Sequence, residues 1–178
     1  EERPKHLDPA RSYSSNEVEF TGQIYEPPLQ YHFLKRPYTL TPLTAEAVPK
    51  PRYFDAAGEA LADDAPPAQI AQSVYEIRIR PGIRYQPHPA FARDAAGRYR
   101  YHALNAAAVA GKTHIGDFEH TDTRELVAAD YVYQIKRLAH PRLSSPIFGL
   151  MAEHIVGLKT LGEALEKAAK AAPDAGLN

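Results

Sequence analysis

The placement of proline is the strongest constraint on how this chain folds. The sequence holds 16 prolines in 178 residues, whereas about 5% of residues are proline in an average protein. They are dispersed through the first half rather than gathered in one linker. Because proline lacks the backbone N–H that a strand ladder needs and also ends helices, it restricts regular structure to short stretches. We therefore expect residues 1–90 to form short strands joined by irregular connections.

Composition excludes several classes of function. Hydrophobic residues make up 44% of the chain, charged residues 24%, and the net charge is -1, values typical of a soluble globular domain with no nucleic-acid partner. The absence of cysteine excludes disulfides, thiol catalysis and cysteine-ligated zinc. Since no apolar run reaches about 18 residues, we expect no membrane-spanning segment.

Periodicity and turn residues predict the elements of the first half. A helix is expected over residues 16–25, with Asn16 as the N-cap and Pro27 as the stop. Strands are predicted at 29–34, at 53–58, where the strand enters a turn, and at 73–80, which is the clearest of the three.

The second half is predicted to be mainly helical. Residues 86–123 show weak periodicity and are interpreted as an insertion with one short helix. A helix is expected to follow Thr123, as N-cap, and to run to about residue 139. Further helices are expected over 146–157 and 158–172. Strands first and helices later predict a mixed α+β fold, or part of one lobe of an α/β protein.

Three segments, in this order, resemble the peptide and dipeptide branch of the bacterial extracellular solute-binding proteins. The first comprises residues 7–10 (LDPA) and 23–29 (QIYEPPL), and the second comprises residues 40–45 (LTPLTA) and 75–85 (YEIRIRPGIRY). The third, residues 126–141 (LVAADYVYQIKRLAHP), is the most specific. In contrast to the family pattern, residues 85–89 (YQPHP) replace the usual turn and the insertion at 86–123 precedes the third segment.

The resemblance implies a role in transport rather than catalysis. It implies that residues 1–178 form a partial N-terminal lobe of a type II periplasmic binding protein-like fold, with the second lobe absent from this sequence. The expected partners are a peptide or peptide-like solute and an inner-membrane ABC permease, and no cofactor is expected. The expected location is the periplasm, and because the chain starts without an apolar signal region, the export signal is expected to have been removed.

The resemblance also implies two groups of ligand-binding residues. By position, the loop after LDP faces the ligand cleft in the family, which assigns contacts with the peptide to Tyr13, Ser14 and Ser15. An extended peptide there would be held largely through main-chain hydrogen bonds. Ile147 and Phe148 follow a serine–proline pair that lies near the ligand in the family. From the residues alone, the first group reads equally well as a surface turn, and the second as core.

Two other functions are open at this point. His102, His114 and His120, with Asp117 and Glu119, suggest a metal-dependent hydrolase that uses the insertion. Their spacing matches no established zinc motif, however, so neither a metal site nor a catalytic residue is assigned. The second alternative is an interaction domain with a helical face at 146–170. Asp130 and Arg137, two helical turns apart, are interpreted as structural.

Overall fold

The computed structural model describes residues 3–172 of the chain, which divide into two compact units. One unit joins residues 3–78 to 128–172 and the other comprises residues 79–127. The ends of the predicted 1–178 lobe therefore lie outside the described residues. The predicted insertion, 86–123, falls inside the second unit.

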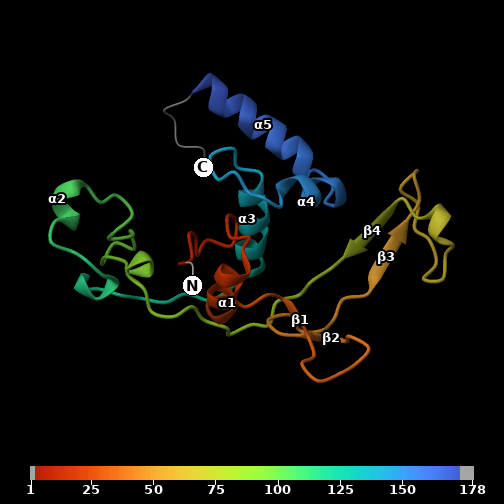
Figure 1. The fold of residues 1–178 in the computed structure, drawn as a ribbon, viewed down its shortest axis with the longest axis horizontal. Coiled ribbons are helices and arrows are strands. Elements are labelled where there is room, and N and C mark those ends of the chain that lie inside the picture. The colour runs from red at the N-terminus through yellow and green to blue at the C-terminus, as the bar shows by residue number, and fades with distance from the viewer. Residues whose placement is uncertain (1–2, 173–178) are drawn as a thin grey trace. The chain divides into compact units, whose positions relative to one another are not determined.

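Helices and strands alternate with much irregular chain, as the prolines predict (Figure 1). The helices are α1 (Ser15–Ile24), α2 (Ala106–Val109), α3 (Ala128–Leu138), α4 (Phe148–His154) and α5 (Leu158–Ala171). The strands are β1 (Leu29–Tyr31), β2 (Leu40–Pro42), β3 (Pro51–Phe54) and β4 (Gln72–Tyr75). Short 3₁₀ turns occur at Pro67–Gln69, Pro89–Phe91 and Ile115–Asp117. A mixed α+β class is confirmed.

The strands form two separate antiparallel pairs. In the first, β1 pairs with β2 and Gln30 lies opposite Thr41; in the second, β3 pairs with β4 and Arg52 lies opposite Val74. The predicted strand at 73–80 is therefore too long, because β4 ends at Tyr75. Its partner β3 is only four residues long, so it cannot pair with residues 76–80. The Arg78 carbonyl there accepts instead from the Glu46 backbone N–H at 2.8 Å.

Two predicted N-caps are wrong. Helix α1 begins one residue early, with Ser14 as its N-cap instead of Asn16. Helix α3 begins at Ala128, because Thr123 is used elsewhere: its hydroxyl donates to the Tyr85 carbonyl. The break between α4 and α5 was predicted correctly, and Gly157 makes it in the left-handed region, at φ 84°, where glycine is favoured.

Two antiparallel bridges pair the first residues of the unit 79–127 with its last residues. Arg84 lies opposite Glu125 and His88 opposite Asp122, and the Glu125 carboxylate accepts a hydrogen bond from the Gly82 backbone at 2.6 Å. Because the chain enters and leaves this unit through paired backbone, the unit behaves as an insertion between β4 and α3.

The buried core is made mostly of small residues. Among the described residues, the large buried aliphatic side chains are Leu138 and Leu158, and the other buried apolar residues are Ala10, Ala45, Pro89, Ala92 and Ala139. Many large apolar side chains of α1, α3 and the β1–β2 hairpin are exposed. The position of the elements therefore depends heavily on polar side-chain contacts.

Candidate functional site

The loop that precedes α1 is organised by one carboxylate. Oε1 of Glu17 accepts hydrogen bonds from the backbone N–H groups of Lys5 and His6, at 3.0 and 2.9 Å. Oε2 accepts from those of Tyr13 and Ser14, at 3.0 and 3.3 Å. The side chain is buried, with 3% of the residue exposed. The bond to Ser14 is the one that the acidic residue of a capping box makes. Glu17 therefore both caps α1 and holds the loop that precedes it.

These hydrogen bonds lower the pKa of Glu17 from its ordinary 4.5 to about 2. The backbone donors of Tyr13 and His6 are the main causes, and they outweigh the opposing effect of burial. A carboxylate that accepts several backbone hydrogen bonds is stabilised in its charged form. Glu17 is therefore ionised at neutral pH.

We predict that Glu17 makes stability depend on pH in the acid range. Since its pKa is lower in the folded chain than in the unfolded chain, its contribution is complete above pH 4.5 and is lost as the pH falls toward about 2. Denaturant unfolding measured between pH 7 and pH 2 should show this loss. In Glu17→Gln the corresponding part of the pH dependence should be missing. An unchanged pH profile in this variant would contradict the assignment.

A bidentate ion pair links the predicted LDP segment to α3. The Arg137 guanidinium donates to Oδ1 and Oδ2 of Asp8 at 2.9 and 2.6 Å, across 129 positions of sequence. Both side chains are partly buried, with 26% and 29% exposed. The guanidinium holds the pKa of Asp8 below its usual value. Paired donors of this geometry are among the strongest polar contacts in proteins.

A second group of polar contacts involves all three resembling segments, through Thr44, Tyr131 and Glu26. The hydroxyls of Thr44 and Tyr131 lie 2.6 Å apart, and Thr44 is fully buried. Tyr131 donates to the Glu26 carbonyl at 2.7 Å, so in the short contact Thr44 is the donor and the Tyr131 oxygen accepts. The longer contact from Thr44 to the Pro27 carbonyl, at 3.3 Å, competes for the same hydroxyl hydrogen. Burial raises the pKa of the Tyr131 phenol, which keeps it protonated and able to donate.

Two of the predicted ligand residues, Tyr13 and Ser14, line a pocket of about 230 Å³ beside the start of α1. Tyr13 is 72% exposed. The remaining lining residues are Arg3, Lys5, His6, Arg11, Asn16 and Glu17. Ser15 is exposed as the first residue of α1 and is not in the lining. The pocket is open and predominantly basic, which suits a ligand with carbonyl or carboxylate groups.

The other predicted pair, Ile147 and Phe148, does not line this pocket. Ile147 is the residue before α4, and Phe148 is its first residue. The Phe148 ring lies so close to Gly162 of α5 that a Cβ built on this glycine would be 2.5 Å from its Cζ. Phe148, which is half-buried, thus packs against α5.

Glu17, which positions Tyr13 and Ser14, is not among the site residues predicted from the sequence. A signal for it was present, because Ser14 and Glu17 have the spacing of a capping box, with Glu at the third position after Ser. The structural interpretation of Arg137 agrees with its geometry, but its partner is Asp8. Nothing local predicts this pairing.

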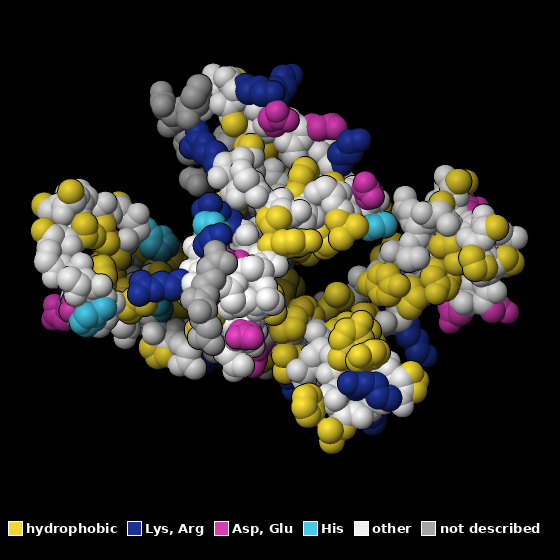
Figure 2. Space-filling view, in the orientation of Figure 1, with side chains coloured by type: hydrophobic (Ala, Val, Ile, Leu, Met, Phe, Trp, Pro, Cys, Tyr) yellow, Lys and Arg dark blue, Asp and Glu magenta, His cyan; other side chains and the backbone are white. Residues whose placement is uncertain are grey.

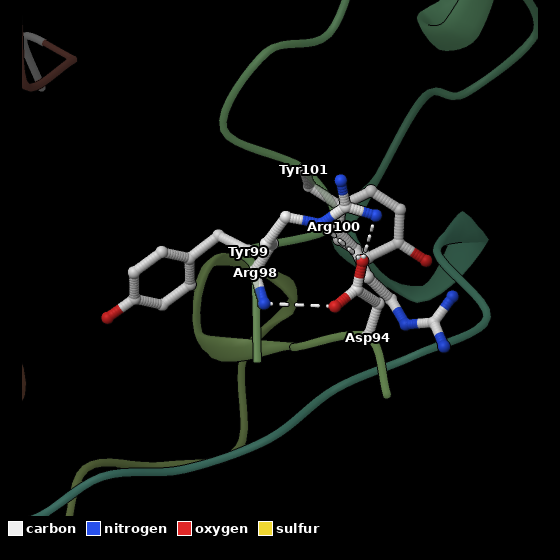
Figure 3. A pocket seen from close by; sticks show the side chains of 5 residues that line it. All are labelled: Asp94, Arg98, Tyr99, Arg100 and Tyr101. Carbon is white, nitrogen blue, oxygen red and sulfur yellow. Dashed lines mark hydrogen bonds and ion pairs between the residues drawn. The ribbon is translucent and has the colours of Figure 1, made fainter. Parts of the chain in front are cut away.

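A larger pocket, of about 460 Å³, lies in the unit of residues 79–127 (Figure 3). Its lining contains Asp94, Arg98 and Arg100, with two tyrosines. Figure 3 shows Asp94 and Arg98 joined to each other, and the Arg100 Nε donates to the Arg93 carbonyl at 3.0 Å. These contacts stabilise a tight turn within residues 93–100, which gives these charged side chains a structural role.

The three histidines considered as metal ligands have separate partners. His114 contacts Asp117 at 3.1 Å and His120 contacts Glu119 at 3.8 Å. His102 stacks on Tyr99, with ring centroids 4.0 Å apart. Over residues 3–172, no group of three or more His, Cys, Asp or Glu side chains is arranged to hold a metal ion.

Comparison with protein-family models, curated proteins and solved structures finds no match to this chain. No helix within residues 3–172 combines the length and apolar character needed to cross a bilayer.

Proposed function

We propose that this chain is part of the first lobe of the solute-binding component of an ABC importer, with a type II periplasmic binding protein-like fold. The component would capture a peptide or peptide-like solute in the periplasm and deliver it to an inner-membrane permease. The full binding site would need a second lobe that closes over the ligand by hinge motion. The role is binding, and no residue is assigned to catalysis.

One observation carries the proposal: the side chains that join the three resembling segments belong to the resembling motifs themselves. Asp8 of LDP pairs with Arg137 of the third segment. Thr44 of the second segment bonds Tyr131 of the third, and Tyr131 also bonds the carbonyl of Glu26 in the first. A chance likeness in separated segments gives no reason for these particular side chains to meet. Shared structural contacts do give such a reason.

The loop at Tyr13 and Ser14 is the proposed contact with the ligand. Their backbone N–H groups already donate to Glu17, so these two groups are not free for strand-like pairing with a peptide. Contacts at this loop would therefore come from the Tyr13 ring, the side chains of the basic pocket and backbone carbonyls. Tyr13 is the best single probe because its ring is 72% exposed and its loss should not disturb the fold.

The test uses the full-length protein encoded by the complete reading frame, mixed with libraries of short peptides. A binding peptide at about one hundred times its Kd should stabilise the protein by about 2.7 kcal/mol, which is read as a rise in Tm. Tyr13→Ala should reduce this rise and leave the Tm of the free protein unchanged. Tyr75→Ala serves as the matched control, because Tyr75 is a half-exposed tyrosine on β4.

Two results would contradict the proposal. The first is the absence of any stabilisation across the peptide libraries, together with no peptide in the mass spectrum of protein purified under native conditions. The second is stoichiometric zinc or manganese in the purified protein that is lost in His114→Ala, which would favour the metal-dependent hydrolase.

A further inference from the structure

The loop between β1 and β2 displays large apolar side chains to solvent. The exposed fractions are 88% for Phe33, 77% for Leu34 and 69% for Tyr38. Scattered exposed hydrophobic residues are ordinary on protein surfaces, but a contiguous cluster of them marks a surface of interaction. This cluster occupies the tip of a hairpin, where it is accessible from several directions.

The loop is ordered by its own hydrogen bonds. Nδ1 of His32 accepts from the backbone N–H groups of Leu34 and Lys35, at 3.2 and 3.3 Å. Nη1 of Arg36 donates to the carbonyls of Phe33 and Lys35, at 3.3 and 2.9 Å. Burying an unpaired backbone group in an apolar medium is costly. At these positions the loop can therefore enter a less polar environment without losing hydrogen bonds to water.

Aromatic and cationic groups lie together at this tip. The rings of Tyr31 and Tyr38 meet edge to face, with centroids 5.6 Å apart. The Arg36 guanidinium lies 4.4 Å from the Tyr38 ring centroid. Tyrosine is enriched at the boundary between membrane and water, and basic side chains there reach the headgroups.

The charge of the hairpin has a single sign. Residues 27–45 contain Lys35 and Arg36 but no aspartate or glutamate, and the flanking acids are Glu26 and Glu46. Figure 2 shows this region as hydrophobic and cationic side chains without acidic ones among them. Because the whole chain has a net charge of -1, this is a local arrangement that is complementary to an anionic surface.

The base of the hairpin is fixed, which holds the tip in place. Backbone N–H groups of Leu43 and Ala45 both donate to the Pro28 carbonyl. The fully buried Thr44 between them bonds Tyr131 of α3. These contacts hold the base of the β1–β2 hairpin against α3.

We infer that the β1–β2 tip is a peripheral contact with anionic membrane lipid. Phe33 and Leu34 enter the interfacial layer of the bilayer, while Lys35 and Arg36 contact the headgroups. The loop is far too short to span a bilayer, so the contact is shallow and reversible. This inference goes beyond the proposed function and stands on the hairpin alone, whether or not the protein binds a peptide.

The test is co-sedimentation of the full-length protein with phosphatidylcholine vesicles, prepared with and without phosphatidylglycerol. We expect binding only to the vesicles that contain phosphatidylglycerol, weakening as salt rises. The double variant Phe33→Ser/Leu34→Ser should bind at least about tenfold more weakly, because two apolar side chains no longer leave water. Lys35→Gln should weaken binding about fivefold, the effect of one cation near an anionic surface.

Two matched controls separate the tip from general surface properties. Val156→Ser removes an 82% exposed apolar side chain between α4 and α5, and Lys50→Gln removes a charge from an exposed position outside the hairpin. Both should bind vesicles like the wild type. All variants should melt near the wild-type temperature, because the changed side chains are exposed.

The inference is wrong if the wild type does not bind these vesicles, or if the double variant binds them as well as the wild type. It is also wrong if the double variant instead abolishes self-association in sedimentation velocity, since the tip would then be an interface between copies. Peptide stabilisation measured on the same variants should be unchanged. Loss of peptide binding in all proteins, with vesicle binding intact, would contradict the proposed function alone.

Discussion

Replacing Arg137 with methionine is expected to lower the free energy of unfolding by about 1–3 kcal/mol, because it leaves the partly buried Asp8 carboxylate without its partner. Arg137 contributes both bonds of the bidentate pair, at 2.9 and 2.6 Å, and only 29% of the Asp8 side chain is exposed. Denaturant unfolding at pH 7 measures the loss directly.

A double-mutant cycle with Asp8→Asn separates the pair from the general effect of changing a large side chain. We expect a coupling energy of about 1.5–3 kcal/mol for a charge-assisted contact of this kind. Arg78→Met is the matched control, since Arg78 pairs with Glu76 at 3.0 Å but both side chains are mostly exposed, at 72% and 61%. An exposed pair of this kind contributes at most about 1 kcal/mol. Equal effects at Arg137 and Arg78 would show that the segments are not held together by this contact.

Gly162→Ala is expected to destabilise the α4–α5 pair, although alanine is the better helix former. The new Cβ would lie 2.5 Å from Cζ of Phe148, and overpacking of this kind costs about 1–3 kcal/mol. The gain in helix propensity, about 1 kcal/mol, offsets only part of this. Thermal unfolding should therefore show a lower Tm.

Gly22→Ala provides the control with the opposite sign. Gly22 lies in α1, and apart from its chain neighbours and the backbone of its own helix, nothing lies within 4 Å of the position where its Cβ would be. The change should therefore stabilise by about 0.5–1 kcal/mol. Phe148→Leu in the Gly162→Ala background should restore part of the loss, because it removes the atom that clashes. A neutral Gly162→Ala would mean that the Phe148 ring is free to move away from α5.

The sequence predicted where helices would lie better than where strands would end. The turn at Gly157, the stop after α1 and the break between β3 and its turn depend on glycine, proline and local periodicity, which act over a few residues. The length of β4 depends on its partner, and β3 supplies only four residues. The N-cap of α1 was missed because Ser14, Ser15 and Asn16 are all good N-cap residues. The choice among them depends on Glu17, which reaches back to the loop.

The sequence by itself determined that the helices and strands are short, because proline and glycine act locally. Only the tertiary structure decided which distant residues meet. Asp8 finds Arg137 across 129 positions and Thr44 finds Tyr131 across 87, and separations of that size leave no periodic signal in a sequence. The same holds for the contact between the Phe148 ring and Gly162 on the neighbouring helix. Local propensity acts over one or two turns of chain, whereas polar pairing and packing depend on which surfaces the whole fold brings together.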